Sequence, residues 1–242
     1  MRKILFAAIT VFITAACYSQ VQLAWAKPYN HAAGFEDYAT VTAVEPAGNI
    51  VVCGANFDDV YANGNIITTI KYDKNGNELW RRLYGGGDIN FSINPVGIAI
   101  DASGNIHILT QNATFNHVYT VLKYSANGTI RWIDRYTGAD GYNSGRMSDI
   151  KVDIAGNVYI AGYAAPATIE RDLNSDSRYV TAKYNADGER EWVRFYNGAL
   201  PGIGRNKAYG LVVDGGGNVY VTGESQLNGQ VDYATVKYSP TG

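Results

Sequence analysis

The stretch DGGGNVYVTGES, at Asp214–Ser225, has three close relatives earlier in the chain. They read DIAGNVYIAGYA at Asp153–Ala164, DASGNIHILTQN at Asp101–Asn112 and EPAGNIVVCGAN at Glu45–Asn56. Successive copies lie roughly 50–60 residues apart, a period typical of units that stack on one another. The recurrence therefore predicts that the chain is built from copies of one structural unit.

A second phrase recurs with the same rhythm. It reads TTIKYDKNGNELWRRLYGG from Thr68, TVLKYSANGTIRWIDRYTG from Thr120 and VTAKYNADGEREWVRFYNG from Val180. Its opening returns as ATVKYSPTG at Ala234–Gly242, and its closing part stands alone as VQLAWAKPYN at Val21–Asn30. The aromatic residues at equivalent positions are Trp25, Trp80, Trp132 and Trp192, and Tyr29, Tyr84, Tyr136 and Tyr196.

Each copy contains four short runs with strand character, such as GLVVD, NVYVTG, ATVKY and EREWVRFY. Glycine-containing turns join the first run to the second and the third to the fourth, which indicates antiparallel hairpins. Four antiparallel strands per repeat describe the blade of a β-propeller, with the recurrent Trp and Tyr filling the space between blades. We therefore expect an all-β fold of four-stranded antiparallel blades.

The repeat resembles the bacterial β-propeller repeat called SBBP. The resemblance rests on K-Y-x-x-x-G-x-x-x-W-x-x-x-Y followed by D-x-x-G-N-[VI]-Y-[VI]-x-G, and it covers nearly all of residues 21–242. The second copy departs from it, with His107 at the Tyr position and Thr110-Gln111 in place of the x-Gly pair. The resemblance implies an exported bacterial surface protein, with the GLVVD run innermost and the Trp-bearing run outermost.

The expected organisation is an outer strand at residues 21–30 and blades at about 38–84, 95–136, 147–196 and 208–242. The last blade lacks an outer strand. The strand at 21–30 could complete it and close a ring of four blades, which would remove two exposed sheet edges. A larger ring, of which these four blades are a part, is the favoured alternative.

The first residues, MRKILFAAITVFITAACYSQ, have the charged start, short apolar run and small residues of a secretory signal peptide, expected at 1–19. Cleavage after Ser19 is favoured, and a lipoprotein anchored at Cys17 is the alternative, although Thr14 departs from the lipobox. The mature protein is expected to be exported, either extracellular or on the outer cell surface, with the periplasm as an alternative. No other stretch reaches membrane length, so no transmembrane span is expected in the mature chain.

The composition argues against nucleic acid as a partner, because the net charge is −2 and no basic block is present. Known catalytic motifs are also absent from the sequence. We expect His31, His107 and His117 to be structural or incidental.

The repeated acids Glu45, Asp101, Asp153 and Asp214 are expected to stabilise their own turns. The repeated lysines are expected to cover the polar side of each blade with their long side chains; they are Lys71, Lys123, Lys183 and Lys237.

Function is expected in the loops that do not repeat. Asp172, Asn174 and Asp176 alternate as the ligands of a Ca²⁺ loop do, but Ser177 and Lys183 occupy positions where that loop has Gly and Glu. Ca²⁺ is accordingly the single cofactor considered. Candidate ligand contacts in the other variable loops are Phe91, Tyr142, Arg146 and Arg205.

Three functions compete. The favoured one is a non-enzymatic binding or scaffold module at the cell envelope, whose partner is a protein or glycan that the sequence does not identify. The second is a glycan-active hydrolase or lyase that uses acids in the central funnel, with Asp149 as the nearest candidate. The third is a Ca²⁺-stabilised carbohydrate-binding adhesin.

Overall fold

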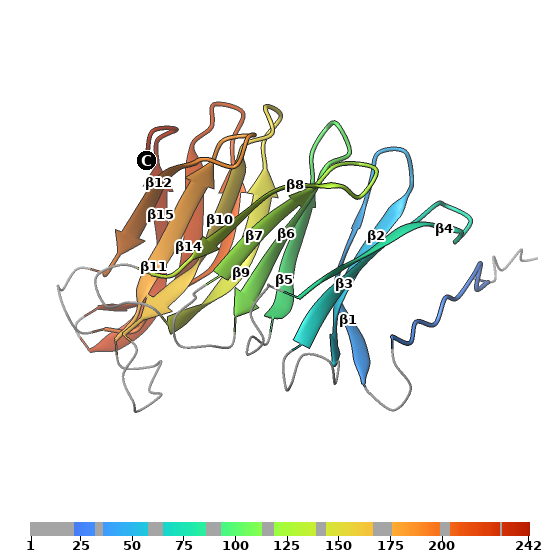
Figure 1. Ribbon diagram of the computed structural model, residues 1–242. Coiled ribbons are helices and arrows are strands. Elements are labelled where there is room, and N and C mark those ends of the chain that lie inside the picture. Colours follow the sequence, from blue (N-terminus) through green and yellow to red (C-terminus); the bar gives the residue numbers. More distant parts are fainter. Residues whose placement is uncertain are drawn as a thin grey trace, which may run out of the picture.

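The computed structural model describes residues 22–31, 36–57, 65–85, 93–112, 119–138, 144–166, 176–198, 204–227 and 229–242. Its regular elements in these ranges are β-strands, which form four separate antiparallel sheets (Figure 1). The predicted signal peptide and Cys17 lie outside the described residues. Among the residues that are described, no helix is long and apolar enough to span a membrane.

The four sheets follow one another along the chain. Sheet 1 consists of β1 (Asp37–Val44), β2 (Ile50–Phe57), β3 (Asn65–Tyr72) and β4 (Glu78–Tyr84). Sheet 2 consists of β5 (Ile93–Ile100), β6 (Ile106–Asn112), β7 (Tyr119–Tyr124) and β8 (Ile130–Tyr136). Sheet 3 consists of β9 (Ser144–Val152), β10 (Val158–Ala165), β11 (Arg178–Tyr184) and β12 (Arg190–Tyr196). Sheet 4 consists of β13 (Asn206–Val213), β14 (Val219–Leu227) and β15 (Gln230–Tyr238). The prediction of an all-β chain of antiparallel units is confirmed.

The tight turn after the first strand of each sheet is built by the repeated acid. In sheet 3, Asp153 Oδ1 accepts the backbone N–H groups of Ala155 and Asn157, both at 2.9 Å. Asn157 in turn donates its side-chain amide to Asp153 Oδ2 at 2.7 Å. Gly156 has a φ of 86°, which side chains with a Cβ rarely adopt. The acid therefore satisfies the turn's own donors, as the sequence predicted.

The sheets pack face to face through three hydrophobic cores, one between each neighbouring pair. Between sheets 2 and 3, for instance, Leu109 and Tyr119 meet Ile160 and Tyr184. The first strands β1, β5, β9 and β13 contact one another in series, so these strands line one edge of the stack. Since a sheet buried on both faces cannot be stable alone, each sheet depends on its neighbours.

The first strand of every sheet carries a β-bulge at the same position. In sheets 1, 3 and 4 a glycine of the second strand lies opposite it, because the backbone comes too close for a side chain. A Cβ added at Gly223 would lie 2.0 Å from the Lys207 carbonyl oxygen, and one at Gly162 would lie 2.3 Å from that of Arg146. The recurrent glycine of the motif is thus explained by a close approach of two backbones.

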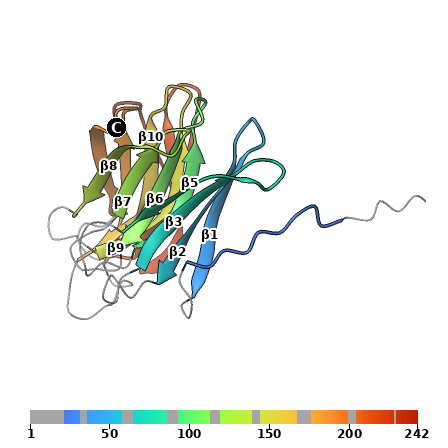
Figure 2. The ribbon, with the colours of Figure 1, turned by 45° about the vertical axis from the view of Figure 1, so that its right-hand side comes forward.

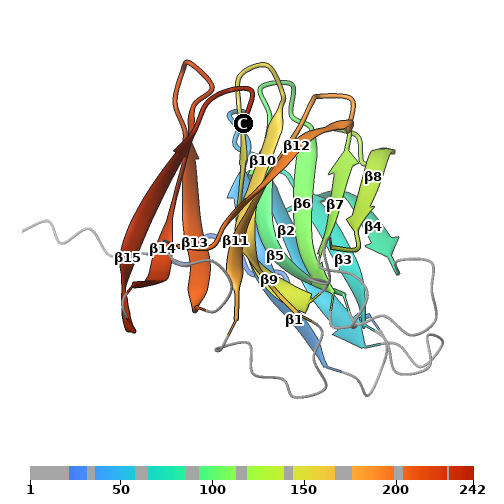
Figure 3. The ribbon, with the colours of Figure 1, turned by 90° about the vertical axis from the view of Figure 1, so that its left-hand side faces the viewer.

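The stack is open. Figure 1 shows sheet 1 at one end and sheet 4 at the other, with β15 far from the N-terminal segment, and Figures 2 and 3 show the same stack from two other sides. Residues 22–31 lie against sheet 1, where Trp25 contacts Tyr72 at 6.0 Å between ring centroids. In the described residues this segment therefore packs on sheet 1, and the alternative in which it completes the last blade and closes a ring of four is not formed.

Candidate functional site

Two ends of the stack differ in chemistry. The tight turns between the first and second and between the third and fourth strands lie at one end of the stack, called here the turn end, and the opposite ends of the same strands form the loop end (Figure 1). Most repeated ionisable residues belong to the turn end, whereas several charged residues that do not repeat lie together at the loop end of sheets 3 and 4.

At the turn end, the repeated lysines bridge neighbouring sheets. Lys71 Nζ donates to Glu45 Oε1 at 2.5 Å and to the Ala126 carbonyl of the next sheet at 3.1 Å. Lys123 and Lys183 make the same kind of bond, to the carbonyls of Ala186 and Pro240. These three lysines are buried, with 5%, 7% and 9% of their surface exposed. The expectation that they cover a polar side is wrong, because each of them lies on the face that the following sheet covers.

The two described histidines and Cys53 have surroundings that suit structural roles. His31 Nδ1 lies 3.3 Å from the Tyr29 hydroxyl, and His107 is fully buried between sheets 2 and 3. Burial raises the pKa of the Cys53 thiol to about 12, so this residue stays protonated within the core. His117 lies outside the described residues.

Asp149, the candidate acid of the enzyme hypothesis, holds two sheets together. Its carboxylate accepts the backbone N–H of Ile150 at 2.8 Å and that of Leu211, in the next sheet, at 3.0 Å. Lys151 also pairs with it. These contacts satisfy the carboxylate with fixed donors, which favours a structural role.

The predicted Ca²⁺ loop is only partly described, because Asp172 and Asn174 lie outside the described residues and Asp176 lies within them. Over the part of the chain that the structure describes, no group of three or more His, Cys, Asp or Glu side chains is placed to hold a metal ion.

The loop end of sheets 3 and 4 brings together charged residues from three strands and the connection that precedes β13. Arg205 Nε donates to Glu224 Oε1 at 2.5 Å, and its NH2 group donates to Oε2 at 3.1 Å, which makes a bidentate pair. Lys207 Nζ lies 4.0 Å from the same carboxylate and 5.1 Å from the centre of the Tyr163 ring. Arg146 lies directly opposite Tyr163 in the β9–β10 register and is exposed. We call these five residues the loop-end cluster.

The electrostatics of the loop-end cluster are dominated by cations. Burial raises the pKa of Tyr163, while Arg146 and Arg205 act to lower it, so both guanidiniums influence this phenol. The Glu224 pKa is lowered: burial acts to raise it, but the hydrogen bonds from Arg205 and Tyr209 outweigh that effect. Arg205 and Lys207 thus flank the Glu224 carboxylate, and the third cation, Arg146, lies opposite Tyr163. The cluster can attract an anion, and bidentate guanidinium groups suit carboxylates.

The sequence predicted two members of this cluster, Arg146 and Arg205. Phe91 and Tyr142 lie outside the described residues. Lys207, Tyr163 and Glu224 were missed, although one signal was available. Glu224 occupies a repeat position that carries Ala55, Gln111 and Tyr163 in the other sheets. Variation at one position of a constant repeat marks a surface that the fold does not specify.

Comparison with known proteins gives little further guidance. No protein-family model matches the sequence, and no curated protein is similar to it. Among solved structures, the chain is similar to a GH43 endo-arabinanase from Bacillus licheniformis, at 10% identity and a TM-score of 0.43. That match covers 81% of this chain and 71% of the other. A similarity this distant does not bear on activity.

Proposed function

We propose that the protein is an exported bacterial binding module built of SBBP-type propeller repeats, and that it acts without catalysis at the cell envelope. Its ligand carries carboxylate groups, as acidic surface glycans do, and binds at the loop-end cluster. The observation that carries the proposal is the separation of roles within the chain. Repeated ionisable residues are used in turns and between sheets, whereas the loop-end cluster repeats nowhere else among the described residues.

The charge of the cluster supports an anionic ligand. Arg146 is exposed and Arg205 is partly exposed, with 38% of its side-chain surface accessible. The full chain has a net charge of −2, so a local excess of cations is not a consequence of composition. Such a patch raises the local concentration of an anionic ligand and orients its carboxylates.

The absence of a catalytic role is proposed on the environment of Asp149. A general acid needs a mobile or exposed proton position close to its substrate. Asp149 instead accepts two backbone N–H groups, one of them from the neighbouring sheet. Fixed donors already occupy both oxygens of this carboxylate.

Binding to defined oligosaccharides tests this function. Titration calorimetry with alginate and polygalacturonate oligosaccharides should show binding, and uncharged cellulose oligosaccharides should not bind. Arg146→Gln should weaken binding roughly 10- to 150-fold, the loss expected for one charge-assisted contact of about 1.5–3 kcal/mol. Arg131→Gln, at an exposed arginine of the outer strand β8, is the matched control and should bind as the wild type does. Equal binding of charged and uncharged oligosaccharides would contradict the ligand, and release of new reducing ends would contradict the non-enzymatic role.

A further inference from the structure

A tryptophan–tyrosine pair recurs at each place where a Trp-bearing segment meets the following sheet. The ring centroids of every pair lie about 6 Å apart, and the pairs are Trp25–Tyr72, Trp80–Tyr124, Trp132–Tyr184 and Trp192–Tyr238. The ring planes of three pairs are inclined at 40–44°, whereas those of Trp132 and Tyr184 are nearly parallel, at 18°. The pair between sheets 2 and 3 is therefore the one in which the two ring faces are stacked.

The residue two positions after the tryptophan sets the charge beside each pair. In chain order this residue is Lys27, Arg82, Asp134 and Arg194. Arg82 and Arg194 lie over the indoles of their own strands, 5.7 and 5.9 Å from the ring centres. A cation beside a ring opposes the loss of an electron from that ring, and a carboxylate favours it. The acid at this position therefore distinguishes the stacked pair from the other three.

Asp134 is also bonded to the phenol of the stacked pair. The Tyr184 hydroxyl donates to Asp134 Oδ2 at 2.6 Å, which is within the reach that proton transfer to a base requires. Tyr184 is fully buried, whereas 24% of the Asp134 side chain is exposed, so this carboxylate connects a buried phenol with solvent. Among the described residues, no carboxylate accepts the hydroxyl of Tyr124 or that of Tyr238.

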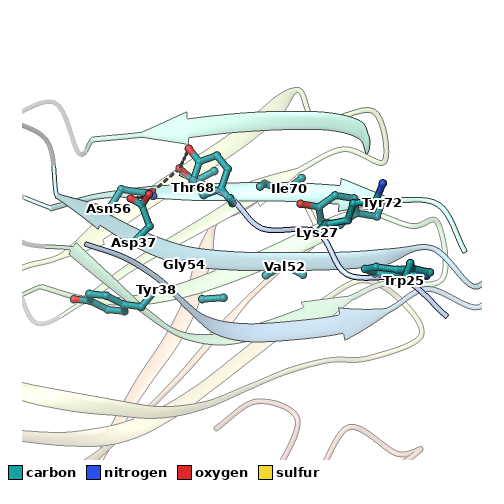
Figure 4. A pocket seen from close by; sticks show the side chains of 12 residues that line it. Trp25, Lys27, Asp37, Tyr38, Val52, Gly54, Asn56, Thr68, Ile70 and Tyr72 are labelled. Atoms are coloured by element: carbon teal, nitrogen blue, oxygen red, sulfur yellow. Dashed lines mark hydrogen bonds between the residues drawn. The ribbon is translucent and has the colours of Figure 1, made fainter. Parts of the chain in front are cut away.

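The pair on sheet 1 has no such acid either. Figure 4 shows Trp25 and Tyr72 toward one end of the strands and Asp37, the acid drawn there, toward the other end. Asp37 accepts the side-chain amide of Asn56 at 2.7 Å. The phenol of this pair thus lies away from the acid in its surroundings.

Tyr119 supplies a second hydrogen bond at the stacked pair. Its hydroxyl lies 3.0 Å from that of Tyr184, and it is the donor because Tyr184 donates to Asp134. The bond from Tyr119 stays in place when Tyr184 gives up its proton. The equivalent position in sheet 1 is Ile67, which has no hydroxyl. Burial raises the pKa of Tyr184, with Tyr119 and Asp134 adding to the effect, so the phenol stays protonated until it is oxidised.

We propose that Tyr184 is a redox-active tyrosine, oxidised by one electron through Trp132 with Asp134 as the proton acceptor. The oxidant comes from solution, belongs to the class of peroxyl radicals and takes one electron from the partly exposed Trp132 indole. An electron from Tyr184 then restores Trp132, while the Tyr184 O–H bond breaks and an O–H bond forms on Asp134 Oδ2. The products are a neutral phenoxyl radical, a neutral carboxyl group and a peroxide anion, which takes a proton from water.

The position of Tyr184 gives its radical a long lifetime. A radical on an exposed phenol, such as that of Tyr38 at 41% exposure, is lost when two molecules meet and couple. Tyr184 is 0% exposed between sheets 2 and 3, so two such radicals do not meet. Oxidation of the protein should therefore come to rest at Tyr184.

Photochemical oxidation tests the proposal. The protein is illuminated with tris(bipyridine)ruthenium(II) and chloropentaamminecobalt(III), which generates the ruthenium(III) complex as one-electron oxidant, and radicals are followed by electron paramagnetic resonance as they decay. The wild type should show a tyrosyl signal that outlives the signals of exposed phenols. This signal should be lost in Tyr184→Phe. It should fall several-fold in Asp134→Asn, because an amide oxygen accepts the hydrogen bond but is too weak a base to take the proton.

Tyr124→Phe is the matched control, because Tyr124 is equally buried beside a tryptophan but has no carboxylate acceptor, and it should leave the signal as in the wild type. Circular dichroism shows whether each variant is folded. If Tyr184→Phe does not fold, Asp134→Asn at the partly exposed carboxylate decides the question. Three results overturn the proposal: no long-lived tyrosyl signal in the wild type, the same signal in folded Tyr184→Phe, or an unchanged yield and lifetime in Asp134→Asn.

Discussion

His107 is the residue at which the repeat departs most from its own pattern. Tyr159 and Tyr220, at the same position of sheets 3 and 4, donate their hydroxyls to the turn acids Asp153 and Asp214. The His107 ring lies instead 3.4 Å from Asp101 through Nε2, and its Nδ1 is buried without a hydrogen-bond partner. Burial, with a contribution from Lys123, lowers the His107 pKa from 6.5 to about 4.

The lowered pKa of His107 predicts that the free energy of unfolding falls in acid. It also predicts that one substitution at this position removes that fall. A histidine whose pKa is lower in the folded state stabilises the protein fully above its unfolded pKa, and this contribution is lost as the pH falls from about 6.5 to about 4. The loss is on the order of 3 kcal/mol. His107→Tyr should lack this loss, because a tyrosine stays neutral throughout that range and can bond Asp101 as Tyr159 bonds Asp153.

Urea unfolding at pH 7, 5.5 and 4 measures the effect. The free energy of unfolding of the wild type should fall more steeply than that of His107→Tyr. The pKa of Asp101 is lowered below 3.8, so its titration falls mostly below the pH range compared: burial acts to raise this pKa, and hydrogen bonds from Asn105 and His107 outweigh that effect. Parallel curves for the two proteins between pH 6.5 and 4 would contradict the assignment.

At the scale of the strand, the β-bulge of the first strand and the glycine that faces it in the second strand depend on each other in sheets 1, 3 and 4. Gly223→Ala should lower the free energy of unfolding by about 1–3 kcal/mol, the usual cost of overpacking, because its Cβ would lie 2.0 Å from the Lys207 carbonyl oxygen. Gly215→Ala in the same sheet has nothing within 4 Å and should change stability by less than about 0.5 kcal/mol. Thermal and urea unfolding of the two variants would reveal the difference, and equal stabilities would argue against a close backbone approach at Gly223.

The strands themselves were predictable, and the direction of some side chains was not. Alternation placed Lys71, Lys123 and Lys183 correctly in third strands, since Tyr and β-branched neighbours identify such runs. The direction in which these lysines point depends on a carbonyl of the next sheet, 55–63 residues further along the chain. A pattern within one strand carries no information on that acceptor, so the lysines were assigned to a polar surface that inner sheets do not have.

At the scale of the whole molecule, the order of the sheets could be predicted from the repeat. Whether the stack of sheets closes into a ring could not. The phase of the Trp positions predicts that each unit packs on the next. Whether residues 22–31 close the same chain depends on how far each sheet rotates about the stack, and no residue pattern encodes that rotation directly. The loop-end cluster could not be predicted for the same kind of reason. Its residues Glu224 and Lys207 meet Tyr163 only when sheet 4 is packed on sheet 3.

The open end of the stack predicts a measurable difference between two equivalent strands. β15 (Gln230–Tyr238) pairs only with β14, whereas β11 (Arg178–Tyr184) is paired on both sides. In dilute solution, hydrogen exchange followed by mass spectrometry should therefore be faster in peptides from β15 than in those from β11, because unpaired edge amides exchange through small local openings. Equal protection of the two strands in dilute solution would mean that the edge of β15 is already covered within one chain.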